Sequence, residues 1–197
     1  MDAGVAAIQD HLDDVWNSLL AAVREVGDDL LQWSPGPEFS SIAMLLRHLA
    51  GSERWWIGEV IGGVPAHRVR ETEFAHDRPA RADVLRAVDE SRALTRRVLS
   101  GVRAADLAAP VQVESARRLS TDARPDKYWA LLHYLEHLGY HRGQILLLRN
   151  LGRKAVSGDR TGEAGRSGSR LGPAPAQPSA APIRRGGPPS RGPSAAR

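Results

Sequence analysis

The chain of 197 residues contains no cysteine. This absence excludes disulfides, cysteine nucleophiles and thiolate-bound zinc, and it is compatible with a reducing compartment. Long apolar runs are missing too, since no stretch approaches the roughly 20 residues that a membrane-spanning helix needs. The N-terminal residues also lack the basic-then-apolar pattern of a signal peptide. A cytoplasmic protein with no membrane partner is therefore expected.

Lysine is scarce as well, because only two of the 27 basic residues are lysine, and the arginines are unevenly placed. Residues 155–197 hold seven arginines against two acidic residues, a net charge of +5, whereas residues 1–154 hold 20 basic and 21 acidic residues, a net charge of −1. These last 43 residues include 15 glycines and prolines and few large apolar side chains, too few to offset the entropy cost of ordering. The sequence predicts a domain at 1–154 and a disordered tail at 155–197, and any contact with nucleic acid is expected to be weak and confined to this tail.

Strand-like alternation is almost absent, and apolar residues instead recur at steps of three and four. This periodicity predicts four helices, at about 5–32, 41–62, 79–102 and 126–151. Asp77 and Pro79 are expected to begin the third helix and Gly152 to cap the fourth, while VQV at 111–113 is a candidate for a short strand. The expected fold is all-α, an antiparallel four-helix bundle.

Three of the seven histidines lie in HYLEHLGYH, residues 133–141, at intervals of four. Each such step on an α-helix turns by about 40° and rises by about 6 Å. Neighbouring members can therefore share one metal ion, whereas the outer two, roughly 12 Å apart, cannot. A helical wheel places His137, His141 and Gln144 on one stripe and His133 to its side. Imidazoles that only form hydrogen bonds within a core remain the alternative.

His48 is the only histidine within the body of another predicted helix, at the edge of its apolar face. It would complete a three-histidine site with open positions, the arrangement of a catalytic metal centre. HYLEH also matches the inverted zinc-protease motif His-x-x-Glu-His, but the size and all-α character of the chain disfavour such a peptidase. Paired Glu-x-x-His motifs of di-iron bundles are absent. Glu53 lies far round its helix from His48 and is expected to pair with an arginine.

Two stretches carry a family resemblance. SIAMLLRHLAGSERWWIGEV, residues 41–60, resembles the second helix of the DinB-like superfamily of four-helix bundles. HYLEHLGYHRGQILLLRNLG, residues 133–152, resembles the fourth helix of that superfamily, in which His-x-x-x-His-Arg-Gly-Gln recurs. The Glu-Arg-Trp-Trp segment is similar to the branch of mycothiol-dependent isomerases and transferases. The resemblance covers roughly residues 5–153.

The resemblance implies a divalent metal, zinc or nickel, held by His48, His137 and His141, together with homodimers and a small-molecule substrate. It further implies a small thiol such as mycothiol or bacillithiol as co-substrate. We expect a metal-dependent thiol S-transferase or hydrolase, because a bound metal lowers the pKa of a thiol or water. Gln144 would orient the ligand or a metal-bound water, and Trp56 would wall the pocket. A non-catalytic helical dimer that binds a metal or small ligand is the alternative.

Overall fold

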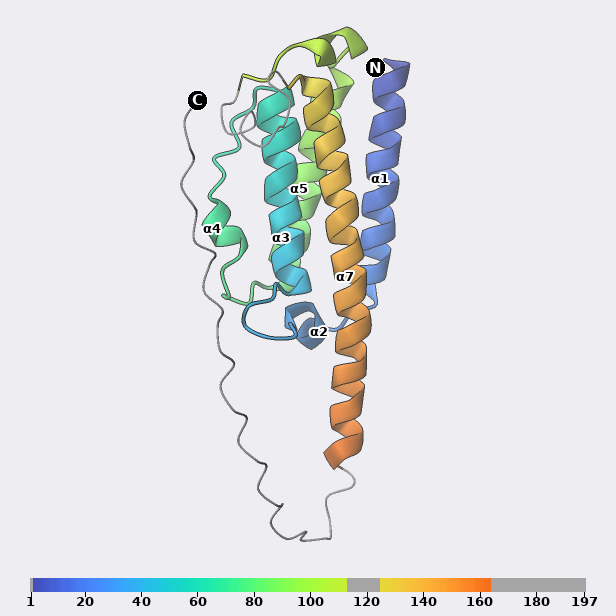
Figure 1. The fold of residues 1–197 in the computed structure, drawn as a ribbon, viewed down its shortest axis with the longest axis vertical. Coiled ribbons are helices and arrows are strands. Elements are labelled where there is room, and N and C mark those ends of the chain that lie inside the picture. Colours follow the sequence, from blue (N-terminus) through green and yellow to red (C-terminus); the bar gives the residue numbers. More distant parts are fainter. Residues whose placement is uncertain (1, 113–124, 164–197) are drawn as a thin grey trace, which may run out of the picture.

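Four long helices form a bundle in the computed structural model, which describes residues 2–112 and 125–163 and side chains up to residue 155 (Figure 1). They are α1 (Ala3–Arg24), α3 (Ile42–Glu53) with its π-helical continuation η1 (Arg54–Ile61), α5 (Arg81–Ser100) and α7 (Lys127–Glu163). Three short elements accompany them: α2 (Asp28–Gln32), α4 (Arg70–Glu73) and the 3-10 turn η2 (Ala104–Ala108). The expected all-α bundle is confirmed. The described part of the candidate strand contributes no strand, and the neighbouring Pro110 forms one isolated bridge with Asp126.

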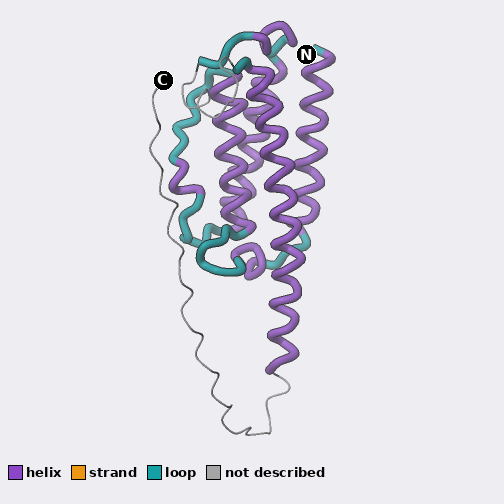
Figure 2. Tube along the Cα trace, in the orientation of Figure 1, coloured by secondary structure: helices purple, strands orange, loops and turns teal. Residues whose placement is uncertain are grey.

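The direction of the helices is set by the long connection at 62–80. Helices α1 and α7 run one way and α3 and α5 the other, so α3 and α5 are parallel to each other, as the sequence colours of Figure 1 show for the arrangement traced in Figure 2. The connection carries α4 back along the bundle and starts α5 beside α2, where Gln32 Nε2 donates to the Pro79 carbonyl at 2.6 Å. Arg81 pairs with Asp28 at the same end, at 2.6 Å. The packed pairs α3–α5 and α1–α7 are therefore parallel, whereas α3–α7 and α1–α5 are antiparallel.

The core lies between the four long helices and consists almost entirely of aliphatic and aromatic side chains. Each fully buried side chain of this kind stabilises the fold by about 1.5–3 kcal/mol. The largest fully buried members are Leu12, Trp16, Leu19, Leu31, Ile42, Leu46, Leu49, Ile57, Leu99, Leu107, Leu131 and Tyr134. Helices α3 and α7 therefore face each other across a close-packed interior that holds their backbones at fixed separation.

The predicted end of the first helix and the predicted start of the third helix were wrong. The helix expected at 5–32 ends at Arg24, and α2 restarts with Gly27 as its N-cap residue. The third helix begins at Arg81, not at Asp77. Asp77 instead accepts two hydrogen bonds from Arg47, at 2.9 and 3.0 Å, which fasten the connection to α3. A carboxylate at a turn can serve either purpose, and the choice depends on the path of the loop.

Gly152 does not cap the fourth helix, because α7 continues to Glu163. A Cβ atom at Gly152 would come within 2.8 Å of the Trp33 ring, so glycine allows α2 and its following residues to pack closely against α7. A glycine inside a helix costs only about 1 kcal/mol, and no proline follows until residue 173. Residues 155–163, the start of the predicted tail, are therefore helical as the end of α7. The remainder of that predicted tail lies outside the described residues.

Within residues 2–112 and 125–163, no helix is both long enough and apolar enough to cross a lipid bilayer.

Candidate metal centre

Three histidines from two helices converge between α3 and α7. His48 Nε2 lies 3.0 Å from His137 Nε2, and His141 Nε2 lies 3.0 Å from the same atom. One ligand atom from each residue lies within 4.8 Å of the other two. The step of four along α7 brings His137 and His141 to one face, and the packing of α3 against α7 supplies His48. His137 and His141 therefore lie together as the helical wheel predicted, and His48 lies beside them, as the resemblance implied.

In two of these rings, Nδ1 lies on the side away from the other histidines and has an oxygen acceptor, which fixes the position of the ring proton. His48 Nδ1 lies 2.8 Å from Glu73 Oε2, and His141 Nδ1 lies 2.6 Å from Gln144 Oε1. An oxygen acceptor at Nδ1 keeps the proton on that nitrogen and leaves a lone pair on Nε2. Both rings therefore direct an Nε2 lone pair toward His137, whose own Nδ1 lies 3.5 Å from Ser52 Oγ.

This donor set fits a divalent transition metal. Zinc binds imidazole nitrogen at about 2.0–2.1 Å, so two nitrogens on a tetrahedral ion lie about 3.4 Å apart. The separations of 3.0 Å between Nε2 atoms are close to that value. Two lone pairs that face a third nitrogen repel one another unless a proton or a cation lies between them, and three converging imidazoles are typical of sites for zinc, nickel and related ions.

Electrostatics keep the rings in the neutral form that binds metal. Burial lowers the pKa of His137 to about 3, assisted by repulsion from His141 and His48. Burial also lowers the pKa of His141, although its hydrogen bond with Gln144 opposes the change. Neutral imidazole is the form that coordinates a metal ion, so neither ring must lose a proton at neutral pH before binding.

His133 lies next to the cluster, with its ring centroid 6.5 Å from that of His137, but it is not one of the three residues whose ligand atoms converge. It stacks on Trp129 with ring centroids 4.9 Å apart and lies 4.7 Å from the ring of Trp56. Trp56 is buried and also contacts Trp55 and Trp129. These aromatic contacts explain why the sequence contains a third histidine at this spacing without requiring it as a ligand. The assignment of Trp56 to a pocket wall stays a prediction.

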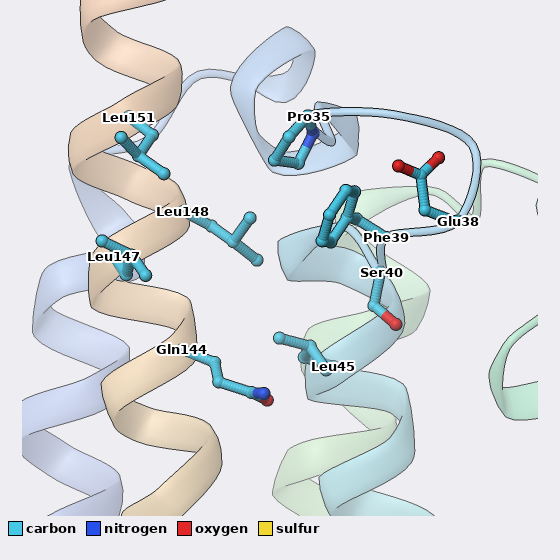
Figure 3. A pocket seen from close by; sticks show the side chains of 9 residues that line it. All are labelled: Pro35, Glu38, Phe39, Ser40, Leu45, Gln144, Leu147, Leu148 and Leu151. Carbon is cyan, nitrogen blue, oxygen red and sulfur yellow. The ribbon is translucent and has the colours of Figure 1, made fainter. Parts of the chain in front are cut away.

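Gln144 connects the three-histidine cluster with a pocket of about 400 Å³. Figure 3 shows its side chain extending from α7 toward Leu45 on α3, with Leu147, Leu148 and Leu151 farther along α7. The pocket is completed by the segment before α3, from Pro35 to Ser40, and Glu38 is the one charged residue in its lining. Besides its contact with His141, Gln144 donates to the Tyr140 hydroxyl at 3.0 Å.

Glu73 and Arg68 were missed in the sequence because they lie in a connection without periodicity. Arg68 donates to both carboxylate oxygens of Glu73, at 2.6 and 2.8 Å. Burial by itself would raise the pKa of Glu73, but hydrogen bonds from Arg68 and His48 hold it below its usual value. The Phe74 ring lies next to that of His48, with centroids 4.7 Å apart. A carboxylate, a guanidinium and an aromatic ring thus surround the outer side of His48.

Glu53 does not pair with an arginine among the described residues, so that expectation was wrong. Its carboxyl group accepts from Ser91 Oγ at 2.9 Å and from Thr95 Oγ1 at 2.8 Å, both on α5. Burial raises the pKa of Glu53 from 4.5 to about 7, against the opposing effect of these hydroxyl groups. The two small polar residues on the buried face of α5 were the signal for a polar partner inside the bundle.

Comparison with known proteins agrees with this architecture. A profile described as the DinB superfamily matches residues 11–145. Among solved structures, the chain is similar to a conserved protein from Enterococcus faecalis, with a TM-score of 0.57 and 18% identity over 77% of this chain and 97% of that chain. At this identity the likeness shows the fold alone. No curated protein matches the chain.

Proposed function

The chain belongs to the DinB superfamily, and we propose that within it the protein is a metal-dependent enzyme, a small-thiol S-transferase or hydrolase. His48, His137 and His141 would hold a zinc or nickel ion. The observation that carries the proposal is the convergence of their three Nε2 atoms, together with the oxygen acceptors that fix the protons of His48 and His141 on the opposite nitrogens. If these imidazoles only had to form hydrogen bonds within the core, their nitrogen lone pairs would not need to point at one place.

The residues around the three histidines set what the site does to a substrate. When bound, the metal supplies a positive charge that lowers the pKa of a thiol or water to near neutrality. Gln144 holds His141 through its amide oxygen and borders the pocket, which supports the proposal that it also orients a bound ligand. His48 is buried while His137 and His141 are partly exposed, so a substrate would approach from the side of α7.

The pocket beside Gln144 is the candidate place for the rest of a small-molecule substrate. Its lining is mainly apolar, from Phe39, Leu45, Leu147, Leu148 and Leu151. A volume of about 400 Å³ lies within the range of small-molecule sites. Among the described residues, no lysine or arginine lines it, which favours an uncharged thiol or substrate such as one of the mycothiol type over a strongly anionic one.

Elemental analysis of protein purified without a polyhistidine tag tests the metal site. We expect close to one equivalent of zinc or nickel per chain in the wild type and almost none in the His48→Ala/His137→Ala double variant. His133→Ala serves as the matched control, because it removes a histidine of the same helix that lies outside the cluster. Equal metal content in the double variant and the wild type would refute the proposed ligand set.

Turnover separates an enzyme from a binding protein on the same scaffold. Cobalt-substituted protein titrated with a small neutral thiol should develop a thiolate-to-metal charge-transfer band, and an electrophile added next should be consumed with formation of a thioether. A band without consumption of any electrophile tested would favour the alternative, a non-catalytic domain that binds a metal or a small ligand. Absence of both the band and turnover in metal-loaded protein would contradict the thiol part of the proposal.

We also propose that the protein forms a homodimer through α7. Five of the large apolar side chains that are exposed in the single chain lie on this helix: Tyr128, Leu132, Tyr140, Leu147 and Leu151. Several exposed apolar side chains on one helix are typical of a surface that pairs with another subunit. The same helix also extends past the bundle (Figure 1). Light scattering should give twice the chain mass, and Leu147→Arg should shift it to the single-chain mass. A monomeric wild type would refute this pairing.

A further inference from the structure

The connection between η1 and α5 is fastened across α3 so that α4 lies against His48. Arg47 holds three points of it: Nε donates to the Glu73 carbonyl at 3.1 Å, Nη2 donates to the Ala75 carbonyl at 2.7 Å, and Nη1 binds Asp77. Gly51 provides the room, since a Cβ atom there would come within 2.9 Å of the Glu73 carboxyl carbon. Three fixed points and a glycine opposite α4 leave Glu73 little freedom of position.

The buried end of this segment is the carboxylate of Glu73, whose side chain is 6% exposed. Its Oε2 atom lies 2.8 Å from His48 Nδ1, the nitrogen that faces away from the other two histidines. A carboxylate can only accept at this position, so the ring proton stays on Nδ1 and the Nε2 lone pair is available. Carboxylates placed in this way orient metal-binding imidazoles and raise their basicity.

Arg68 keeps Glu73 from serving as a metal ligand or a base itself. Its Nε and Nη2 donate to the two oxygens at 2.6 and 2.8 Å, a bidentate pair in which both oxygens are engaged. Arg68 therefore donates to each oxygen once, and Oε2 also accepts from His48 Nδ1. Every polar atom of the carboxyl group is therefore committed to Arg68 or His48.

We propose that Glu73 is a positioning residue, which holds His48 in the Nδ1–H tautomer and so directs its Nε2 lone pair to the metal site. The expected effect of Glu73 on metal affinity rests on the proposed metal site. The tautomer of His48, in contrast, is also a property of the metal-free protein. Glu73 acts only through His48, and its role is distinct from that of Gln144, which is neutral and holds His141.

The test uses Glu73→Gln, in which the guanidinium decides how the new amide is oriented. The shorter contact, from Arg68 Nε at 2.6 Å, keeps the amide oxygen at the Oε1 position, so the NH₂ group takes the Oε2 position that faces His48 Nδ1. Arg68 Nη2 then loses its acceptor at that position. The amide then donates to Nδ1 and shifts the ring proton to Nε2, where it blocks metal binding. Glu71→Gln on the same short helix is the control, because Glu71 is exposed and lies outside these contacts.

Long-range ¹⁵N–¹H spectra of the imidazoles in metal-free full-length protein give the tautomer, and zinc titration gives the affinity. We expect Nδ1–H at His48 in the wild type and in Glu71→Gln, Nε2–H in Glu73→Gln, and a roughly 10- to 100-fold weaker zinc affinity in Glu73→Gln alone. An Nε2–H tautomer in the folded wild type would overturn the proposal without any variant. An unchanged tautomer and affinity in Glu73→Gln would overturn it as well.

These readouts also separate this inference from the proposed function. A wild type that binds no metal yet shows the tautomer reversed by Glu73→Gln would refute the metal site and support the positioning role. A wild type that binds metal with the tautomer and affinity unaffected by Glu73→Gln would support the metal site and refute the positioning role.

Discussion

Glu53 gives the most direct test of how the interior of the bundle is built. The residue is 1% exposed and lies between α3 and α5, where the hydroxyl groups of Ser91 and Thr95 donate to its carboxyl group at 2.9 and 2.8 Å. Two neutral donors compensate poorly for the loss of water around a negative charge. The folded protein therefore favours the uncharged carboxyl group, which is why the pKa of Glu53 rises to about 7.

The size of the effect follows from the two pKa values. In the unfolded chain Glu53 ionises around its ordinary pKa of 4.5, and in the folded protein around 7. Between these values the folded state holds the proton more strongly, so the free energy of unfolding falls as the pH rises. At about 1.4 kcal/mol per pH unit, the folded protein is destabilised by about 3 kcal/mol above pH 7 compared with acid conditions.

Glu53→Gln should remove this penalty, because the amide has nearly the same shape and no charge to desolvate. We expect the variant to exceed the wild type in free energy of unfolding by about 3 kcal/mol at pH 8 and by under about 1 kcal/mol at pH 5. Urea unfolding followed by circular dichroism at both pH values, with a chelator present, measures the difference. Comparing variant with wild type at each pH cancels the opposite contribution of the buried histidines.

Glu90→Gln is the control, since the Glu90 side chain is 57% exposed on the same helix that supplies Ser91. It should change the free energy of unfolding by the same small amount at both pH values. A Glu53→Gln variant that is less stable than the wild type at pH 8, or a difference that does not grow from pH 5 to pH 8, would refute the account. Either result would mean that the carboxylate is well solvated or paired in the folded protein.

Further predictions concern the long helix and the metal. Gly152→Ala places a methyl group against Trp33 and should lower the free energy of unfolding by about 1–3 kcal/mol, whereas Gly143→Ala, with open space around its Cβ, should raise it by up to about 1 kcal/mol in the same urea assay. Asp126→Ala removes the side-chain acceptor of the first turn of α7 and should cost about 1 kcal/mol, seen as a lower thermal midpoint. Zinc at 100 times its Kd should stabilise the wild type by about 2.7 kcal/mol, and should leave the His48→Ala/His137→Ala variant unchanged in calorimetry.

The helical fold and the pairing of His137 with His141 could be predicted from local patterns in the sequence. Apolar residues at steps of three and four fix helices without reference to the rest of the chain, and the step of four between His137 and His141 places both rings on one face of α7. The exclusion of His133 from that pair rested on the same rotation per residue, and its stacking on Trp129 agrees with it. His48 could be predicted as the third member because it is the only histidine within the body of another predicted helix.

The parallel course of α3 and α5, the place of Glu73 and the packing around Gly152 had no local signal. Glu73 meets His48 across 25 positions because Arg47 fastens a loop without periodicity, and the path of such a loop depends on contacts that form only after the helices have packed. Gly152 reads as a helix stop from its neighbours alone, yet it is a contact point for Trp33. Hydrogen bonds and side-chain periodicity within one helix join residues three or four positions apart, so they can be predicted from the sequence of that helix alone. Which helix faces which, and which carboxylate reaches which imidazole, depends on close packing between segments far apart in that order.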